Sequence, residues 1–418
     1  MFRIPQIIRP VLVLAVTALL AGCAGRHADS GGELPGTAAL MRAVPSDAFS
    51  VMAAAHAADL MELLDSADAL RELDLGRVLR RRAVLSSNYD GRVERLLVLE
   101  VAGDTTFVPD LSCLGSAARM SLSPDSQLLL ISESANLLGA ALRHLRAGSS
   151  ILEAPGFTDA LRAAGHEPCL ILKNAGVDRW PVTFPQIPGL TPRHLLNFVR
   201  NATRWTVVLP ELNHRGQLRV LPVQEEKDTY YMAAFGSLDA SSSQLPAILP
   251  AETDFAVSLP LSKAEDYLEA RERWLDANMQ LVRYNKALDE LRKKTRSNPR
   301  SWILSQGIRE LALVRWDGSE ILACRTDRRA RTVETGPNPA PDYFGMLFGN
   351  LFDLPDESTC CTFGKWTLVG SVADLEKFVT CESRLESVPW SEKNKLAVVY
   401  TPEGTLCWTR QGIEIKMN

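Results

Sequence analysis

Two short sequence signatures each occur twice in this chain, and they occur in the same order. The first is a proline turn followed by an apolar strand, at residues 44–51 and again at 249–257. The second is an apolar strand that leads into Ala135-Asn136-Leu137 in one place and Ala373-Asp374-Leu375 in the other. Because proline fixes φ and cannot donate to a β-ladder, its position marks the entry to a strand. The repetition predicts two copies of one domain, since the spacing is far too long for a solenoid.

Each copy has the pattern of the α+β class. In copy one a helix follows the first strand, further strands are expected at 93–101 and 118–122, and a second helix follows a later strand. Copy two matches with strands at 308–316 and 320–326, joined by turn residues. We therefore expect two copies of a mostly antiparallel sheet covered by helices, which we place on one face of each sheet.

Copy two differs from copy one at residues 262–296. Apolar side chains recur there every seven residues, which predicts one long amphipathic helix with a narrow apolar seam. These residues are Tyr267, Trp274, Leu281 and Leu288. Two interpretations remain open: the helix is a docking arm for a partner helix, or it lies across its own sheet. Small alanines in the seam favour the second interpretation.

The two copies are joined by a connecting region at residues 179–245. Thr191-Pro192 supplies an N-cap and a first-turn proline for a helix. Strands are expected after this helix at 204–209, 217–223 and 229–235, and we expect them to extend the sheet of a neighbouring copy. The predicted layout is a signal over 1–22, a flexible tether over 23–40, the first copy over 41–178, the connecting region, and the second copy over 246–418.

The N-terminus has the form of a secretory signal. Arg3 and Arg9 precede an apolar run at 11–20 that is too short to span a bilayer, and the run ends in Leu20-Ala21-Gly22-Cys23. These four residues resemble the lipobox of bacterial lipoproteins, which implies that the chain is cut before Cys23 and that Cys23 carries diacylglycerol and an acyl chain such as palmitate. Ala24, which is not Asp, favours the outer membrane. An ordinary signal that contains a cysteine is the alternative.

Several motifs together resemble those of a family of exported lipoproteins. They are the proline turn with Asp or Glu, the Ala-Asn/Asp-Leu helix start, Arg204-Trp205-Thr206-Val207-Val208, and Gly216-Gln217-Leu218-Arg219-Val220. Over nearly all of its length after the signal, the chain is similar to uncharacterised lipoproteins of Bacteroides-like bacteria that carry a domain of unknown function. The resemblance implies the duplicated architecture and the lipid anchor, and it brings no catalytic or binding residue.

No familiar catalytic or metal-binding motif occurs in the sequence. His166-Glu167-Pro168-Cys169 comes nearest to a metal cluster, but two further ligands with matching spacing are missing, so we interpret it as a strand entry. The vicinal pair Cys360-Cys361 is expected to place one side chain in the core and one outside. We predict no catalytic residue, cofactor or metal site. A formal net charge of -4 gives no electrostatic reason to expect a nucleic-acid partner.

Other residues with functional chemistry give weaker signals. Of the eight cysteines, those after Cys23 lie mostly in apolar runs, which predicts reduced, buried thiols. We interpret the loop carboxylates as solvated charge and a phenylalanine stripe as core, whereas exposed aromatics are the side chains expected to contact a glycan. The carboxylates are Glu225, Glu226, Asp353, Asp356 and Glu357, the stripe is Phe344, Phe348 and Phe352, and the loop aromatics are Trp180 and Phe184. A glycan-binding protein would require Trp180 and Trp205 to be exposed.

The sequence as a whole favours a binding or scaffolding protein of the bacterial cell envelope. Lipid on Cys23 would hold it to the membrane, and its partner would be an envelope protein or a glycan. The alternatives are an extracytoplasmic hydrolase of an unrecognised type and a surface glycan-binding lipoprotein. A hydrolase requires two or more carboxylates, or a Ser/His pair, that the fold brings together.

Overall fold

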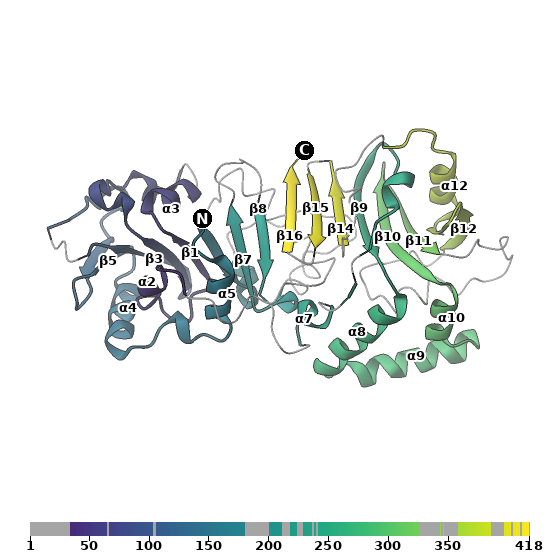
Figure 1. Cartoon of the computed structure of the whole chain (residues 1–418), viewed down its shortest axis with the longest axis horizontal. Coiled ribbons are helices and arrows are strands. Elements are labelled where there is room, and N and C mark those ends of the chain that lie inside the picture. The colour runs from purple at the N-terminus through teal and green to yellow at the C-terminus, as the bar shows by residue number, and fades with distance from the viewer. Residues whose placement is uncertain are drawn as a thin grey trace. The chain divides into compact units, whose positions relative to one another are not determined.

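The structure is a computed structural model, in which contacts divide the chain after Gln224 into unit 1 and unit 2 (Figure 1). Each unit consists of an antiparallel sheet with packed helices, which confirms the α+β class. The residues described are 34–64, 67–102, 106–179, 200–210, 218–223, 229–235, 238–239, 241–326, 343, 346, 358–385, 397–402, 404–409 and 412–417. No helix among them is both long and apolar enough to cross a bilayer.

The sheet of unit 1 has the strand order β8-β7-β6-β1-β2-β3-β5-β4, and its neighbouring strands are antiparallel. Two of the three strands expected in the connecting region, β7 and β8, therefore extend this sheet. The strands are β1 (Ser50–Ala54), β2 (Ala83–Tyr89), β3 (Val93–Glu100), β4 (Arg119–Leu122), β5 (Leu128–Ser132), β6 (Cys169–Lys173), β7 (Trp205–Pro210) and β8 (Leu218–Pro222).

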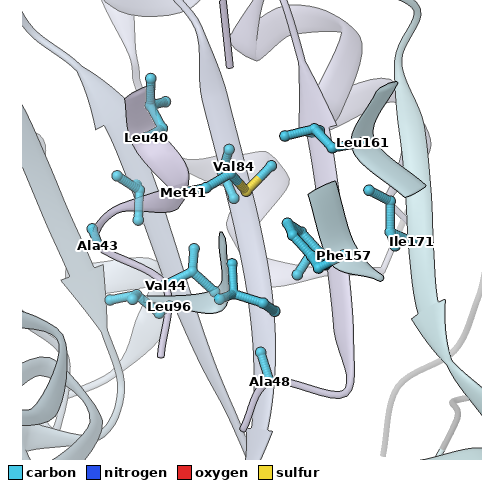
Figure 2. Close-up of a cluster of buried hydrophobic side chains, with 14 of the residues drawn as sticks. Leu40, Met41, Ala43, Val44, Ala48, Val84, Leu96, Phe157, Leu161 and Ile171 are labelled. Atoms are coloured by element: carbon cyan, nitrogen blue, oxygen red, sulfur yellow. The ribbon is translucent and has the colours of Figure 1, made fainter. Parts of the chain in front are cut away.

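Helices cover both faces of the unit 1 sheet, so the prediction of a single covered face was wrong for this unit. Val84 and Leu96 lie in the core under α2, α4 and α5, whereas Leu85 and Leu97 pack with Leu60 of α3 on the opposite face (Figure 2 shows part of the first core). The central strands are apolar at consecutive positions, and such strands are stable only when both faces are buried. The helices are α2 (Ala38–Met41), α3 (Ala57–Leu63), α4 (Ala135–Ala147) and α5 (Phe157–Ala164), and the 3-10 helices are η1 (Ala69–Glu72), η2 (Gly76–Arg80), η3 (Ser112–Leu114), η4 (Ile151–Glu153) and η5 (Asn174–Arg179).

The sheet of unit 2 has the order β12-β13-β11-β10-β9-β14-β15-β16. Its strands are β9 (Thr253–Pro260), β10 (Ile308–Trp316), β11 (Ser319–Thr326), β12 (Thr359–Phe363), β13 (Trp366–Gly370), β14 (Ala397–Thr401), β15 (Gly404–Thr409) and β16 (Gly412–Met417). Its helices are α7 (Tyr231–Phe235), η6 (Leu245–Ile248), α8 (Ala264–Ala277), α9 (Leu281–Thr295), α10 (Pro299–Ser305) and α12 (Val372–Thr380).

The two sheets repeat one topology, which confirms the two copies. Each unit places its first strand beside its second on one side and its sixth on the other, and α4 and α12 follow equivalent strands. The predicted strand correspondence was wrong by one strand, because β2 was missed: β10 matches β2, and β11 matches β3. The turns agree with this correction, since Gly91 and Gly318 both adopt positive φ, at 72° and 71°, in the hairpins after β2 and β10.

The third strand predicted in the connecting region, at 229–235, is the helix α7. Phe235 packs on Tyr267 of α8 with ring centroids 5.1 Å apart, and Arg273 donates to the Ala234 carbonyl at 3.1 Å. A short apolar run is compatible with either a strand or a helix. Here packing against α8 favours the helix.

Candidate functional site

Unit 2 has one large element that unit 1 lacks, which is the helical connection from β9 to β10. We call residues 264–305, which contain α8, α9 and α10, the arm. At the same position unit 1 has only α3 and two short 3-10 helices. Because α9 lies beyond the ends of the unit 2 strands in Figure 1, the expected helix across its own sheet is wrong. The docking interpretation stays a prediction.

The arm contains two helices with a break between them, where the heptad pattern predicted one continuous helix. Asn278 ends α8, the Met279 amide donates to the Asp276 carbonyl at 2.9 Å, and the Gln280 amide donates to the Leu275 carbonyl at 2.7 Å. These two bonds form a Schellman motif, which terminates a helix through a left-handed residue. That residue is Met279, with φ of 58°. The apolar spacing continues across the break, so periodicity alone did not reveal it.

The break presents two apolar side chains to solvent. Met279 is 93% exposed and Val282 is 84% exposed, and we call this pair the tip. Glycine is the usual residue at a left-handed helix terminus, and a side chain there costs roughly 1 kcal/mol. The Met279 side chain is not required for helix termination, which glycine would perform without strain, and at 93% exposure it does not pack in the core. The tip is therefore a candidate contact surface.

Contacts within unit 2 hold the arm in place at the break and beside it. The Asn278 amide group donates to the Thr229 carbonyl at 3.0 Å and to the Trp274 carbonyl at 2.9 Å. The Arg271 guanidinium lies over the ring of Tyr284, 5.3 Å from its centroid, and joins α8 to α9. Burial raises the pKa of the Tyr284 hydroxyl above its ordinary value. The tip thus projects from a well-packed helical pair.

Replacing Met279 with glycine is expected to stabilise the protein by about 0.5–1 kcal/mol, because glycine adopts the left-handed conformation without strain. Urea unfolding of the full chain measures this difference. Val282→Ser, at the other tip position, is the control and should change the free energy of unfolding by less than about 0.5 kcal/mol. A loss of stability in Met279→Gly would show that the methionine side chain has a packing role.

The structure places Trp205 in the core and thereby removes it as a glycan contact. Its side chain is 0% exposed, its ring meets Phe157 at 5.2 Å between centroids, and its Nε1 donates to the Pro155 carbonyl at 2.8 Å. The burial of Trp205 therefore counts against the glycan-binding alternative. The other predicted candidates lie outside the described residues, and they are Cys23, Trp180, Phe184, Glu225, Glu226, Phe344, Phe348, Phe352, Asp353, Asp356 and Glu357.

The cysteines after Cys23 are free thiols, and Cys169, Cys324 and Cys407 are buried. Burial raises the pKa of Cys169 to about 12, so this thiol stays protonated at neutral pH. Cys361 packs against the core of unit 2, as expected for one member of the pair, but both Cys360 and Cys361 are half-buried on β12, so neither is fully buried or fully exposed. No group of three or more His, Cys, Asp and Glu in the described part of the chain could hold a metal ion.

The core of unit 2 contains a buried carboxylate that was not predicted from the sequence. Glu310 on β10 is 0% exposed and accepts hydrogen bonds from the hydroxyls of Ser243 and Ser258, both at 2.6 Å. Its other oxygen accepts from the backbone N–H of Gln244 at 2.8 Å and from Arg325 Nε at 3.2 Å. Both carboxylate oxygens are bonded within the protein, which indicates a structural role. The sequence signal that could have revealed this site is a Glu and an Arg in two neighbouring apolar strands, at positions 310 and 325, which pair across β10 and β11.

Comparisons of the chain with protein-family models, with curated proteins and with solved structures found no match. The fold and the arm define a duplicated α+β protein with a projecting helical pair. The family resemblance described from the sequence motifs stays a prediction.

Proposed function

We propose that this protein is a lipid-anchored binding or scaffolding protein of the bacterial cell envelope, and that the arm of unit 2 is its binding element. The observation that supports this proposal is the tip, where Met279 and Val282 are 93% and 84% exposed on an internally bonded helix break. Exposed apolar side chains on an ordered framework are typical of protein contact sites. The lipobox supplies the membrane anchor at Cys23, in the outer membrane.

The chemistry of the tip favours a protein partner over a glycan. Glycan sites stack sugars on aromatic rings, whereas the tip consists of a thioether and a branched aliphatic side chain. Methionine adapts its shape to an apolar pocket at small conformational cost. Arg283 and Lys286 are exposed in the first turns of α9. A partner with an apolar pocket bordered by acidic groups fits this surface.

Replacing Cys23 with serine is expected to abolish membrane attachment, because hydroxyl oxygen does not replace sulfur as the site of lipidation and several acyl chains make a stable anchor. Membrane and soluble fractions of cells that produce each full-length protein are compared by blotting. Ser30→Ala, in the predicted tether, is the matched control and should stay in the membrane fraction. A Cys23→Ser protein that remains in the membrane fraction would show that another element anchors the chain.

Photo-cross-linking in intact cells tests the binding role of the arm. A photoreactive residue in place of Val282 is expected to give one discrete cross-linked product, which Met279→Asp in the same chain should reduce at least tenfold, because a charge would have to enter the apolar contact. Val108 of unit 1, which is 66% exposed, is the control position and should give no discrete product. Equal products at both positions, or a product unaffected by Met279→Asp, would contradict the proposal.

A further inference from the structure

A group of arginines lies at the end of the unit 1 sheet where β2 begins and β3 ends. We call residues 77–82, which run from η2 to the start of β2, the basic patch. It contains four arginines, at positions 77, 80, 81 and 82. The Glu100 amide, at the end of β3, donates to the Arg82 carbonyl at 3.0 Å and fixes the patch at this end of the sheet.

The charge of the basic patch is only partly balanced within unit 1. Arg82 binds both carboxylate oxygens of Glu100, through Nε at 2.9 Å and through Nη2. The Asp74 carboxylate, just before η2, accepts a backbone N–H at 3.0 Å. Arg80 and Arg81 are exposed, and among the described residues neither has an ion-pair partner. The patch therefore carries surplus positive charge.

The basic patch also presents an apolar side chain from an ordered base. Leu79 is 36% exposed, whereas Val78 is 3% exposed and packs in the core under α3. The Ala57 amide donates to the Arg81 carbonyl at 2.7 Å and holds the end of η2. Basic side chains beside an exposed leucine are typical of surfaces that bind at a membrane interface.

The chain enters unit 1 beside the basic patch. Leu34 is the first described residue, and the Gly36 carbonyl accepts from Arg82 Nη1 at 2.5 Å. A Cβ on Gly36 would lie 2.8 Å from the same nitrogen, so the two segments are in close contact. The chain that precedes Leu34 is therefore joined to unit 1 at this end of the sheet.

The proposed lipid on Cys23 is close to this end of the sheet along the chain. Ten residues separate Cys23 from Leu34, and the connection spans at most about 40 Å when fully extended. A flexible chain of this length has an average end-to-end distance of about 18 Å. The anchor would therefore keep the basic patch near the membrane surface.

We infer that the basic patch binds the phosphate groups of anionic lipids in the membrane that holds the anchor, an inference that rests on the proposed function. Arginine forms paired hydrogen bonds to phosphate, and its charge is attracted to an anionic surface within a Debye length. Leu79 enters the headgroup region beside the arginines. The contact is separate from the arm, which belongs to unit 2.

Photo-cross-linking to lipid in intact cells tests the inference. Phospholipids are labelled with radioactive phosphate, and a photoreactive residue in place of Leu79 is expected to transfer label to the full-length protein on illumination. Val93, which is 40% exposed at the start of β3, is the control position, because it lies at the opposite end of the same strands. Label at position 79 no greater than label at position 93 would overturn the inference.

Charge variants of the protein with the photoreactive residue at position 79 test the role of the arginines. Arg80→Glu with Arg81→Glu should lower the light-dependent label at least about fivefold, because the surface then repels anionic headgroups. Arg80→Lys with Arg81→Lys keeps the charge and should retain the label within about threefold. Arg92→Glu, in the hairpin at the other end of β2, should leave the label unchanged. No loss in the double Glu variant, or an equal loss in Arg92→Glu, would overturn the inference.

The purified lipidated protein, placed in vesicles, separates headgroup charge from simple proximity. Vesicles of phosphatidylcholine alone are compared with vesicles that contain about a quarter phosphatidylglycerol, and lipid cross-linking at position 79 should be at least about fivefold stronger in the second. Equal cross-linking would overturn the inference. A protein absent from the membrane fraction of cells would refute the proposed anchor and the inference with it. A protein present in that fraction without label at position 79 would overturn the inference alone.

Discussion

Replacing Glu310 with alanine is expected to lower the free energy of unfolding by about 3–5 kcal/mol, because it leaves a partly buried arginine without its partner in the core. The change removes the acceptor for two serine hydroxyls, for Arg325 and for the backbone before β9. Each buried donor left without an acceptor adds a desolvation cost. Because these groups belong to one network, the effect should be among the largest of any single substitution in unit 2.

Urea unfolding, followed by circular dichroism, measures the effect of Glu310→Ala. Glu376→Ala, at an exposed position of α12, is the control and should stay within about 0.5 kcal/mol of wild type. If Glu310→Ala lowered the free energy of unfolding by less than about 1 kcal/mol, water would be taking over the hydrogen bonds that the carboxylate accepts. In that case the hydrogen bonds from Ser243, Gln244 and Leu245 to this carboxylate would not be a main source of stability in unit 2.

Replacing Trp205 with alanine is expected to destabilise unit 1 by about 3–5 kcal/mol, because a fully buried indole would leave a large cavity. The ring packs edge-on to Phe157, and its N–H is bonded to the Pro155 carbonyl. Trp205→Phe keeps an aromatic ring but leaves that carbonyl without a donor, so we expect a smaller loss of about 1–3 kcal/mol.

The same unfolding measurement tests the Trp205 prediction. Val108→Ala truncates a side chain that is 66% exposed and should change stability by less than about 0.5 kcal/mol. If Trp205→Ala were no more destabilising than Val108→Ala, the indole would not be a core residue. A glycan-contact role for Trp205 would then be open again.

Elements whose structure depends only on neighbours along the chain could be predicted from the amino-acid sequence. The proline turns at Pro45 and Pro250, the hairpin at Asp317-Gly318 and the helix starts at Ala135 and near Ala373 all follow from local backbone preferences. Their repetition was sufficient to predict two α+β copies. The proposed anchor at Cys23 also rests on the sequence alone, and it stays a prediction.

The sequence predicted only part of the candidate site. The heptad pattern located the arm, but it hid the break at Met279, because helix termination there depends on bonds from Asp276 and Leu275 rather than on glycine or proline. Exposure of the tip depends on which residues the rest of unit 2 covers. No pattern along the chain carries that information.

Tertiary structure alone decided the pairings between distant residues. Strand β2 was missed because Ser86, Ser87 and Asn88 are polar but buried, which breaks the alternation by which half-buried strands are recognised. The partners of Arg82 and Glu310 follow from strand register, which joins residues far apart in sequence. Local chemistry thus specified the turns and helix ends of each copy, and long-range packing determined the strand pairing and the partners of the buried charges.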